Sequence, residues 1–343
     1  MISLIAIIFT FSVVIFVHEL GHFIVALKSG VDVEVFSLGF GREIFGFTRK
    51  GVRYRISAVP LGGYVRMKGD TMEDESAGEP GSFLSLDPLR RIPVLISGAA
   101  MNYITGALIL FLIIYLAGMT QVVDEPVIGG LVEGYPAVEA GFEEGDRILT
   151  VDGAGVSTWQ ELVSMVSERG GEVINFKVDR EGEVINIEAA PEYEEASGRG
   201  FLGITAPVEE VKLGFFESIV ESIRYVFFIS LTLLEFLWLM ITGRMEADVS
   251  GPIGIAHAVS DAARHGLISL FQLIALISVQ LGLINLLPVP ILDGGHIVLA
   301  FAEKVKGSAL DPKKIAVANM IGVSLLIALI LFATWQDILR VFQ

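Results

Sequence analysis

The stretch Thr10-Phe-Ser-Val-Val-Ile-Phe-Val-His18-Glu19-Leu20-Gly21-His22 places three ionisable side chains in an otherwise apolar run. On a helix, His18 and His22 project from the same face because they are four residues apart, and both imidazoles can reach one metal ion. Glu19 lies close enough to remove a proton from a water molecule at that metal. The alternative is a membrane helix whose histidines merely hydrogen-bond to neighbouring helices. It is disfavoured, because each ionisable group at membrane depth costs a few kcal/mol.

The composition predicts a polytopic α-helical membrane protein that also carries a water-soluble domain. Of the 343 residues, 53% are hydrophobic and the mean hydropathy is +0.66, which is too apolar for an ordinary soluble protein. The net charge of −16 is concentrated between Asp124 and Lys212, where twenty residues are acidic and six are basic. Such an acidic segment argues against nucleic acid as a partner. The chain has no cysteine, so any zinc site must use nitrogen and oxygen ligands.

Four transmembrane helices are predicted from apolar runs of sufficient length, at 1–28, 92–117, 267–296 and 313–337. The polar loop 29–91 contains alternating segments at Val33–Gly41 and Val52–Val59, and the second continues to Met67. This alternation predicts a β-hairpin sheet that lies against the membrane. Segment 215–243 is ambiguous, because charged residues share one face of its first turns. It is either a further span or an amphipathic helix in the interface.

Positive charges predict the orientation of the chain in the membrane. The loop from Ser29 to Pro93 carries nine lysine and arginine residues, and four more lysines lie between Lys304 and Lys314. Both segments are therefore expected in the cytoplasm, with the two termini and the acidic domain outside. Only one crossing is then possible between Val208 and Asp293, and the helix at 267–296 provides it. Segment 215–243 is accordingly expected to lie in the interface.

Residues 124–208 resemble a PDZ domain of the bacterial protease type. The resemblance rests on the glycines, prolines and aspartates of Val127–Gly141 and Gly145–Gly153, followed by a helix-like segment at Thr158–Val166 and strands around 173–178 and 184–189. A generic small β-rich domain is the alternative, because turn signals alone are common. In a PDZ domain, Gly200-Phe201-Leu202-Gly203-Ile204 is expected to form the loop that binds a free carboxylate.

Two histidines leave zinc short of a protein ligand, and Asp293 is the candidate for the third. It lies in Asn285-Leu-Leu-Pro288-Val-Pro290-Ile-Leu-Asp293-Gly294-Gly295-His296, where prolines open the helix and glycines allow close backbone approach. By the charge bias, Asp293 and His18 lie at matching depths toward the cytoplasmic side. Asp293 has an alternative role as the N-cap of a helix that begins near His296. His296 is expected to be an outer group near the metal rather than a ligand.

These motifs together resemble the site-2 protease family of intramembrane zinc metalloproteases, specifically the bacterial type that regulates sigma-E. The resemblance covers nearly the whole chain: His18–His22, Pro60–Tyr64, the PDZ-like domain, Gly251–Ile253 and Asn285–His296. It implies that His18, His22 and Asp293 bind Zn²⁺ and that Glu19 is the catalytic base. It also implies that the hairpin accepts unwound substrate as an added strand, and that the substrate contacts include Asn285, Pro288, Pro290, Gly62 and Gly63. Gly98–Asn102 lacks the proline that usually follows this glycine, and only one PDZ domain is present.

The expected function is hydrolysis of peptide bonds within the transmembrane segments of single-span proteins of the bacterial inner membrane. Anti-sigma factors and leftover signal peptides are possible substrates, and the PDZ domain either excludes untrimmed substrates sterically or binds a free C-terminus. The domain's negative charge favours steric exclusion, with substrates trimmed first by another protease. Two other functions stay open. A zinc transporter would have no use for a PDZ domain or a sheet edge, and a non-catalytic PDZ scaffold would not need Glu19.

Overall fold

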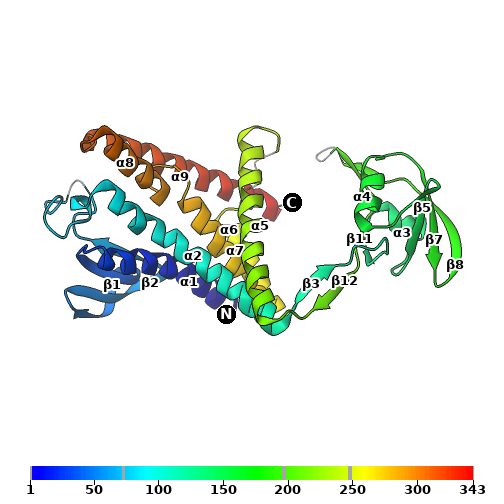
Figure 1. Cartoon of the computed structure of the whole chain (residues 1–343), viewed down its shortest axis with the longest axis horizontal. Helices are drawn as coiled ribbons and strands as arrows, with labels where there is room; N and C mark the ends of the chain where they lie inside the picture. Colours follow the sequence, from blue (N-terminus) through cyan, green and yellow to red (C-terminus); the bar gives the residue numbers. More distant parts are fainter. Residues whose placement is uncertain (1, 72–73, 195–197, 246–248, 343) are drawn as a thin grey trace. The chain divides into compact units, whose positions relative to one another are not determined.

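The computed structural model describes residues 2–71, 74–194, 198–245 and 249–342 (Figure 1). The chain forms two compact units, and each is described by itself. The first unit contains residues 1–113 and 215–343, and the second contains residues 114–214. The first residue of the predicted span 1–28 lies outside the described residues.

Five described helices of the first unit are long and apolar enough to cross a membrane, one more than the sequence predicted. They are α1 (Ile2–Lys28), α2 (Pro88–Ala117), α5 (Phe215–Ile241), α7 (Leu267–Asn285) and α9 (Pro312–Phe342). The additional helix is α5, which matches segment 215–243. Its length and composition are compatible with a crossing, and its predicted position in the interface stays a prediction. Two shorter helices are α6 (Pro252–His265) and α8 (Asp293–Lys306).

Helices α1 and α7 run in the same direction, and α2 runs antiparallel to them. The ring of Phe9, near the start of α1, contacts Phe271 near the start of α7. At the other end of α7, Asn285 lies beside His18. The α2–α7 contact has the reverse order: a Cβ at Gly106 would touch Val279, and one at Gly282 would touch Ala99. Small residues at these crossings let the helices approach closely.

Helix α5 packs on α2 and α7 through one narrow stripe. Its buried residues Val226 and Ile229 share a cluster with Leu110, Ala275 and Val279. In Figure 1, α5 runs across the direction of α2 and α9 rather than alongside them. Most of its other large apolar side chains are exposed, which fits contact with lipid.

The predicted hairpin consists of two strands that are longer than the sequence pattern suggested, β1 (Val33–Arg49) and β2 (Val52–Met67). Lys50 and Gly51 form the tight turn between them, and both have positive φ, as a hairpin turn requires. The first part of β1 has strand partners on both sides, since Val35 is opposite both Arg53 and Arg66. In the described structure, the last part of β2 has only β1 as a strand neighbour, so Gly63–Met67 forms an open edge.

The second unit contains a four-stranded antiparallel sheet in the order β6-β5-β7-β8 (Ala154–Gly155, Arg147–Val151, Ile174–Arg180, Glu183–Ala189). The predicted helix and both predicted strands are present. Helix α4 (Trp159–Ser167) starts at Thr158, whose side chain accepts a hydrogen bond from the Glu161 N–H. Short strand pairs complete the unit: β3 (Met119–Val122) with β12 (Val208–Val211), β4 (Gly130–Leu131) with β11 (Ile204–Thr205), and β9 (Glu192–Glu194) with β10 (Arg199–Phe201). Helix α3 is Pro136–Ala140.

Candidate metal centre

His18, His22 and Asp293 come together in the first unit, with one ligand-capable atom of each facing the same point. The two Nε2 atoms are 3.1 Å apart, and Asp293 Oδ2 lies 3.2 Å from His18 Nε2 and 3.4 Å from His22 Nε2. Both histidines are buried, and Asp293 is partly buried. Among the described residues, this is the one group of at least three such side chains that fits a metal ion.

The triangle fits a tetrahedral zinc site in its size and in its chemistry. Zinc bonds of about 2.0–2.1 Å in a tetrahedron place neighbouring ligand atoms roughly 3.3–3.4 Å apart, close to the three distances observed. Asp293 Oδ2 is buried and makes no hydrogen bond, although two imidazole nitrogens lie next to it. Nitrogen and carboxylate oxygen are ligands that zinc commonly accepts. Two imidazole nitrogens and a carboxylate oxygen therefore converge on one point, and the oxygen makes no hydrogen bond there. This is the arrangement expected of three ligands to one metal ion.

An interruption between two helices brings Asp293 to this position. The sequence predicted a transmembrane segment over 267–296 in which two prolines open the helix; in the structure, α7 ends at Asn285 and α8 begins at Asp293. Pro288 and Pro290 have no backbone N–H and disfavour helical conformation at the residues before them. The connecting turn is so tight that Ile291 has a φ of 81°.

Asp293 is not an N-cap, because Leu292 occupies that position and no side chain caps α8. The two following glycines have the close contacts that the sequence suggested. A Cβ at Gly294 would lie 2.2 Å from the Leu286 carbonyl oxygen, and one at Gly295 would lie 2.2 Å from that of Val289. Both glycines are therefore required for the start of α8 to pack on the turn that precedes it.

Two further glycines let α2 pack directly on the histidine face of α1. A Cβ at Gly21 would lie 2.2 Å from the Ser97 carbonyl oxygen, so any side chain there would separate the helices. A Cβ at Gly98 would lie 2.3 Å from His22 Nε2 and 2.8 Å from His18 Nε2, in the space between the ligand atoms. No sequence pattern marks a role for Gly98. It keeps the centre open.

Glu19 lies next to the triangle but does not belong to it. Its Oε2 accepts a hydrogen bond of 3.0 Å from the Val65 N–H, which fixes the carboxylate against the open edge of β2. The two glycines before Val65 make this contact possible. A Cβ at Gly62 would lie 2.9 Å from the Ile15 side chain of α1, and one at Gly63 would lie 2.4 Å from the Ser37 carbonyl oxygen.

The other residues expected to contact substrate surround the turn between α7 and α8. Asn285 Nδ2 lies 3.4 Å from His18 Nε2, so this amide borders the triangle directly. Pro288 is exposed. The Pro290 carbonyl oxygen would lie 2.2 Å from a Cβ at Gly322, which shows that α9 packs tightly against the turn.

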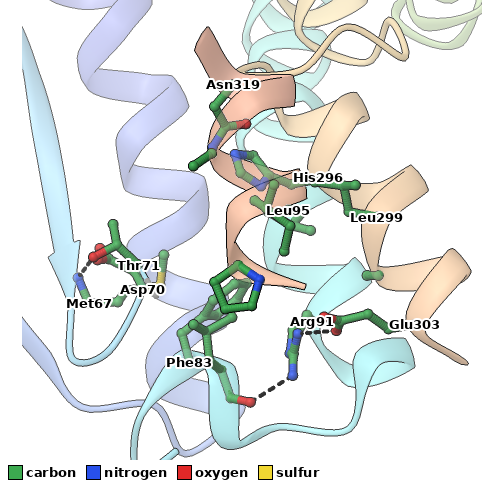
Figure 2. A pocket seen from close by; sticks show the side chains of 15 residues that line it. Met67, Asp70, Thr71, Phe83, Arg91, Leu95, His296, Leu299, Glu303 and Asn319 are labelled. Carbon is green, nitrogen blue, oxygen red and sulfur yellow. Dashed lines mark hydrogen bonds and ion pairs between the residues drawn. The ribbon is translucent and has the colours of Figure 1, made fainter. Parts of the chain in front are cut away.

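A cavity of about 350 Å³ lies close to the centre, lined by residues of β2, α2, α8 and α9 and of the β2–α2 connection (Figure 2). Three of its lining residues lie close in sequence to residues at or beside the centre. Met67 is two residues after Val65, Leu95 is three residues before Gly98, and His296 is three residues after Asp293. His296 therefore borders this cavity and is not among the three converging ligands.

A buried ion pair between α2 and α8 lines part of this cavity. Arg91 donates to Glu303 over 2.7 Å, and both side chains are nearly inaccessible to solvent (Figure 2). A second pair joins Lys304 of α8 to Asp87, the residue just before α2, at 3.0 Å, and this hydrogen bond lowers the pKa of Asp87. These contacts tie the helix that carries Asp293 to the helix that packs on both histidines.

The predicted carboxylate-binding loop of the second unit spans the end of β10 and the start of β11. Gly203 has a φ of 83°, and a Cβ there would lie 2.1 Å from the Tyr135 Cβ. Leu202 is buried, and its carbonyl accepts a hydrogen bond from the Ala137 N–H. Phe201 is exposed.

The model of the family described as "Peptidase family M50" matches residues 6–329. A protein of Brucella suis is 35% identical over 361 residues, which cover 98% of this chain and 95% of that protein. "Regulator of sigma-W protease RasP" of Bacillus subtilis is 28% identical over 422 residues, covering 99% of each. "Zinc metalloprotease RasP" of Geobacillus kaustophilus is also 28% identical, over 99% of this chain and 98% of its own length.

Among solved structures, part of the chain is similar to the PDZ domain of an SdrC-like protein from Listeria innocua. That match has 18% identity and a TM-score of 0.23, and it covers 26% of this chain and 100% of that one.

Proposed function

The chain belongs to peptidase family M50, and from this premise we propose that it is a multi-pass membrane zinc metallopeptidase that cleaves peptide bonds within membrane-spanning segments. The observation that carries the proposal is the triangle of His18, His22 and Asp293 inside a bundle of apolar helices, with Glu19 beside it. Relatives that align over nearly the full chain are named zinc metalloproteases, which supports zinc as the metal. A transporter or a scaffold would not require a carboxylate held next to the ligand triangle.

In the proposed mechanism, His18, His22 and Asp293 hold the zinc ion. When bound, zinc would polarise the scissile carbonyl and lower the pKa of a water molecule toward neutrality. Glu19 removes the proton from the attacking water and then delivers it to the nitrogen of the leaving amine. The hydrogen bond from the Val65 N–H keeps one carboxylate oxygen in place, so the other can accept the proton.

We propose that the substrate binds to the open edge of β2 as an added strand. A transmembrane helix shields its own carbonyl groups, so it must unwind locally before one of them can reach the metal. The edge Gly63–Met67 lies beside Glu19 and has no strand neighbour on its outer side among the described residues. Gly62 and Gly63 support this arrangement because they let β2 pack closely on α1 and β1. Asn285, Pro288 and Pro290 would contact the unwound chain from the end of α7 and the turn that leads to Asp293.

The most direct test of the proposed class combines metal analysis with a cleavage assay on a reconstituted single-span peptide. A metallopeptidase contains zinc and cuts the peptide, and chelation stops the cutting. A zinc transporter would bind metal without cutting, and a scaffold would do neither. Cleavage that survives complete removal of metal would refute the proposal.

We propose that α5 does not cross the membrane, that the protein lies in a bacterial inner membrane, and that both termini and the second unit face outside. The directions of α1, α2 and α7 support this topology. Helix α2 is antiparallel to α1, and α7 is parallel to α1. The segment from the end of α2 to the start of α7 therefore begins and ends on the same side of the membrane. The segment therefore makes no crossing or two crossings.

Single cysteines test this topology, because the chain has none of its own. Cysteines at Gly182 in the second unit and at Gly243, just beyond α5, should both react with a membrane-impermeant reagent added outside intact cells. A cysteine at Lys306 should react only after the membrane is breached. Labelling at Gly243 only after breaching would mean that α5 spans.

We propose further that the second unit acts as a PDZ domain that excludes single-span partners with large outer domains, so that substrates must first be trimmed by another protease. Its strongly acidic composition disfavours capture of a peptide carboxylate, which supports exclusion over binding. An anti-sigma factor is a suitable substrate class, because one relative is named a regulator of sigma-W.

Removing residues 126–207 should allow cleavage of an untrimmed substrate. The two ends that this deletion joins lie close together in the structure, because the Val123 N–H donates a hydrogen bond to the Pro207 carbonyl. Phe201→Glu, an exposed change in the predicted loop, should alter cleavage of a trimmed substrate less than twofold. Gly203→Glu is unsuitable for this purpose, because any side chain there collides with Tyr135. If the deleted protein still requires trimming, the exclusion role is wrong, and strong loss with Phe201→Glu would instead support binding of a free C-terminus.

A further inference from the structure

Asn102 is a fully buried polar residue of α2 whose side chain faces the candidate metal centre. Its Nδ2 lies 3.3 Å from His18 Nδ1, the ring nitrogen that does not face Asp293. Its Oδ1 is buried and has no hydrogen-bond partner. Its backbone carbonyl accepts a hydrogen bond of 3.0 Å from the Ser278 hydroxyl of α7, which fixes this turn of α2.

The imidazole chemistry determines how this amide must be oriented. His18 can bind a metal through Nε2 only if that nitrogen carries no proton, so in the neutral ring Nδ1 carries it and acts as a donor. An amide nitrogen cannot accept that hydrogen bond. The oxygen and nitrogen of an asparagine side chain have nearly the same shape and exchange places by a 180° rotation. After this rotation, Oδ1 accepts from His18 Nδ1–H and gains the partner that it lacks.

The second histidine has the equivalent contact from the same helix. His22 Nδ1 lies 2.8 Å from the Val94 carbonyl oxygen, which can only accept, and this bond leaves His22 Nε2 free for a metal. Because α1 and α2 are antiparallel, the pairs occur in reverse order: His18 with Asn102, and His22 with Val94. Gly98 lies midway between the two acceptors and leaves room for the ligand atoms.

We infer that Asn102 is a positioning residue that accepts the Nδ1–H of His18 through its side-chain oxygen and so fixes the tautomer and ring orientation needed for metal binding. Helix α2 thus orients both imidazoles of α1, one through a side chain and the other through a backbone carbonyl. The inference rests on the proposed zinc site. It goes beyond it by assigning a function to a residue that is neither a ligand nor a base.

Zinc affinity of purified variants, measured by competition with a chromophoric chelator, tests this role without an activity assay. Asn102→Leu keeps the size of the side chain but removes the acceptor, and it should weaken zinc binding about 10–100-fold, the usual effect of losing such a partner. Asn102→Asp retains an acceptor at the same place and should bind zinc at least as tightly as the unchanged protein. Asn102→Ala should behave like Asn102→Leu, and it carries the test if the leucine variant does not fold.

Thr10→Val is a matched control, because Thr10 of α1 is fully buried and has an unpartnered side-chain oxygen, as Asn102 does, but it is not part of the triangle. It should leave the zinc affinity unchanged. Wild-type affinity in both Asn102→Leu and Asn102→Ala would overturn the inference, as would equal weakening in Asn102→Asp. These outcomes differ from failure of the proposed function, in which the unchanged protein itself would bind no zinc.

Discussion

Glu19→Gln abolishes cleavage of a single-span substrate while the purified protein keeps its zinc: this is the expected result for a residue that acts as a base and not as a ligand. Glutamine has nearly the same size, and its carbonyl oxygen can still accept the Val65 N–H, so the local structure is retained. It cannot take up a proton at neutral pH. Loss of a general base alone reduces rates about 10²–10⁴-fold, which brings turnover below ordinary detection.

The decisive measurement for Glu19 is a pair of values on one preparation, the zinc content and the rate of substrate cleavage. A variant that loses zinc together with activity would show that Glu19 is a ligand or a structural residue. A variant that retains more than a tenth of the activity would show that another group acts as the base.

Asp293→Ala should lose both zinc and activity, although the substitution removes only one of three ligands. Two imidazoles remain, and structural or catalytic zinc sites ordinarily require at least three protein ligands. We expect the zinc content to fall below a tenth of that of the unchanged protein after dialysis against a mild chelator. Near-stoichiometric zinc in this variant would refute the ligand assignment.

His296→Gln is the matched control for Asp293. It lies one turn further along α8 and borders the cavity beside the centre, and it is not one of the three converging residues. We expect it to retain its zinc. Loss of metal in both variants to the same degree would show that the start of α8 is merely fragile.

The candidate ligands could be recognised from the sequence because their chemistry is unusual in its surroundings. His18, Glu19 and His22 are ionisable residues in an apolar helix, and their spacing alone places the imidazoles on one face. Asp293 could be proposed as the third ligand from the prolines and glycines around it, and the same prolines indicated an opening of the helix. The pattern did not give the bounds of the break, because the turn after Asn285 also packs against α8 and α9.

Contacts between distant parts of the chain could not be read from patterns of hydrophobicity. The pairing of Val35 with both Arg53 and Arg66 depends on how β2 curls around β1. Arg91 and Glu303 are 212 residues apart, and neither lies in a recognisable motif. The Val94 carbonyl is a backbone group, so no sequence pattern could mark it as the partner of His22.

Helix α5 shows where composition is insufficient. Its length and hydropathy suit a span, whereas the charge distribution predicts that it does not cross. The two arguments concern different quantities. The first concerns whether one helix is long and apolar enough to cross, and the second concerns how many crossings the whole chain can make. The directions of α1, α2 and α7 require the segment between α2 and α7 to make either no crossing or two crossings. The cysteine-labelling experiment decides between these two numbers.

The most direct measurement is identification, by mass spectrometry, of the bond that the purified zinc-loaded protein cuts in a reconstituted single-span substrate. Cutting at a bond within the apolar segment is expected, with Glu19→Gln giving no product in parallel. Product formed by cutting only in the soluble flanks, or formed equally by the Glu19→Gln variant, would contradict the proposal that this protein is an intramembrane zinc peptidase.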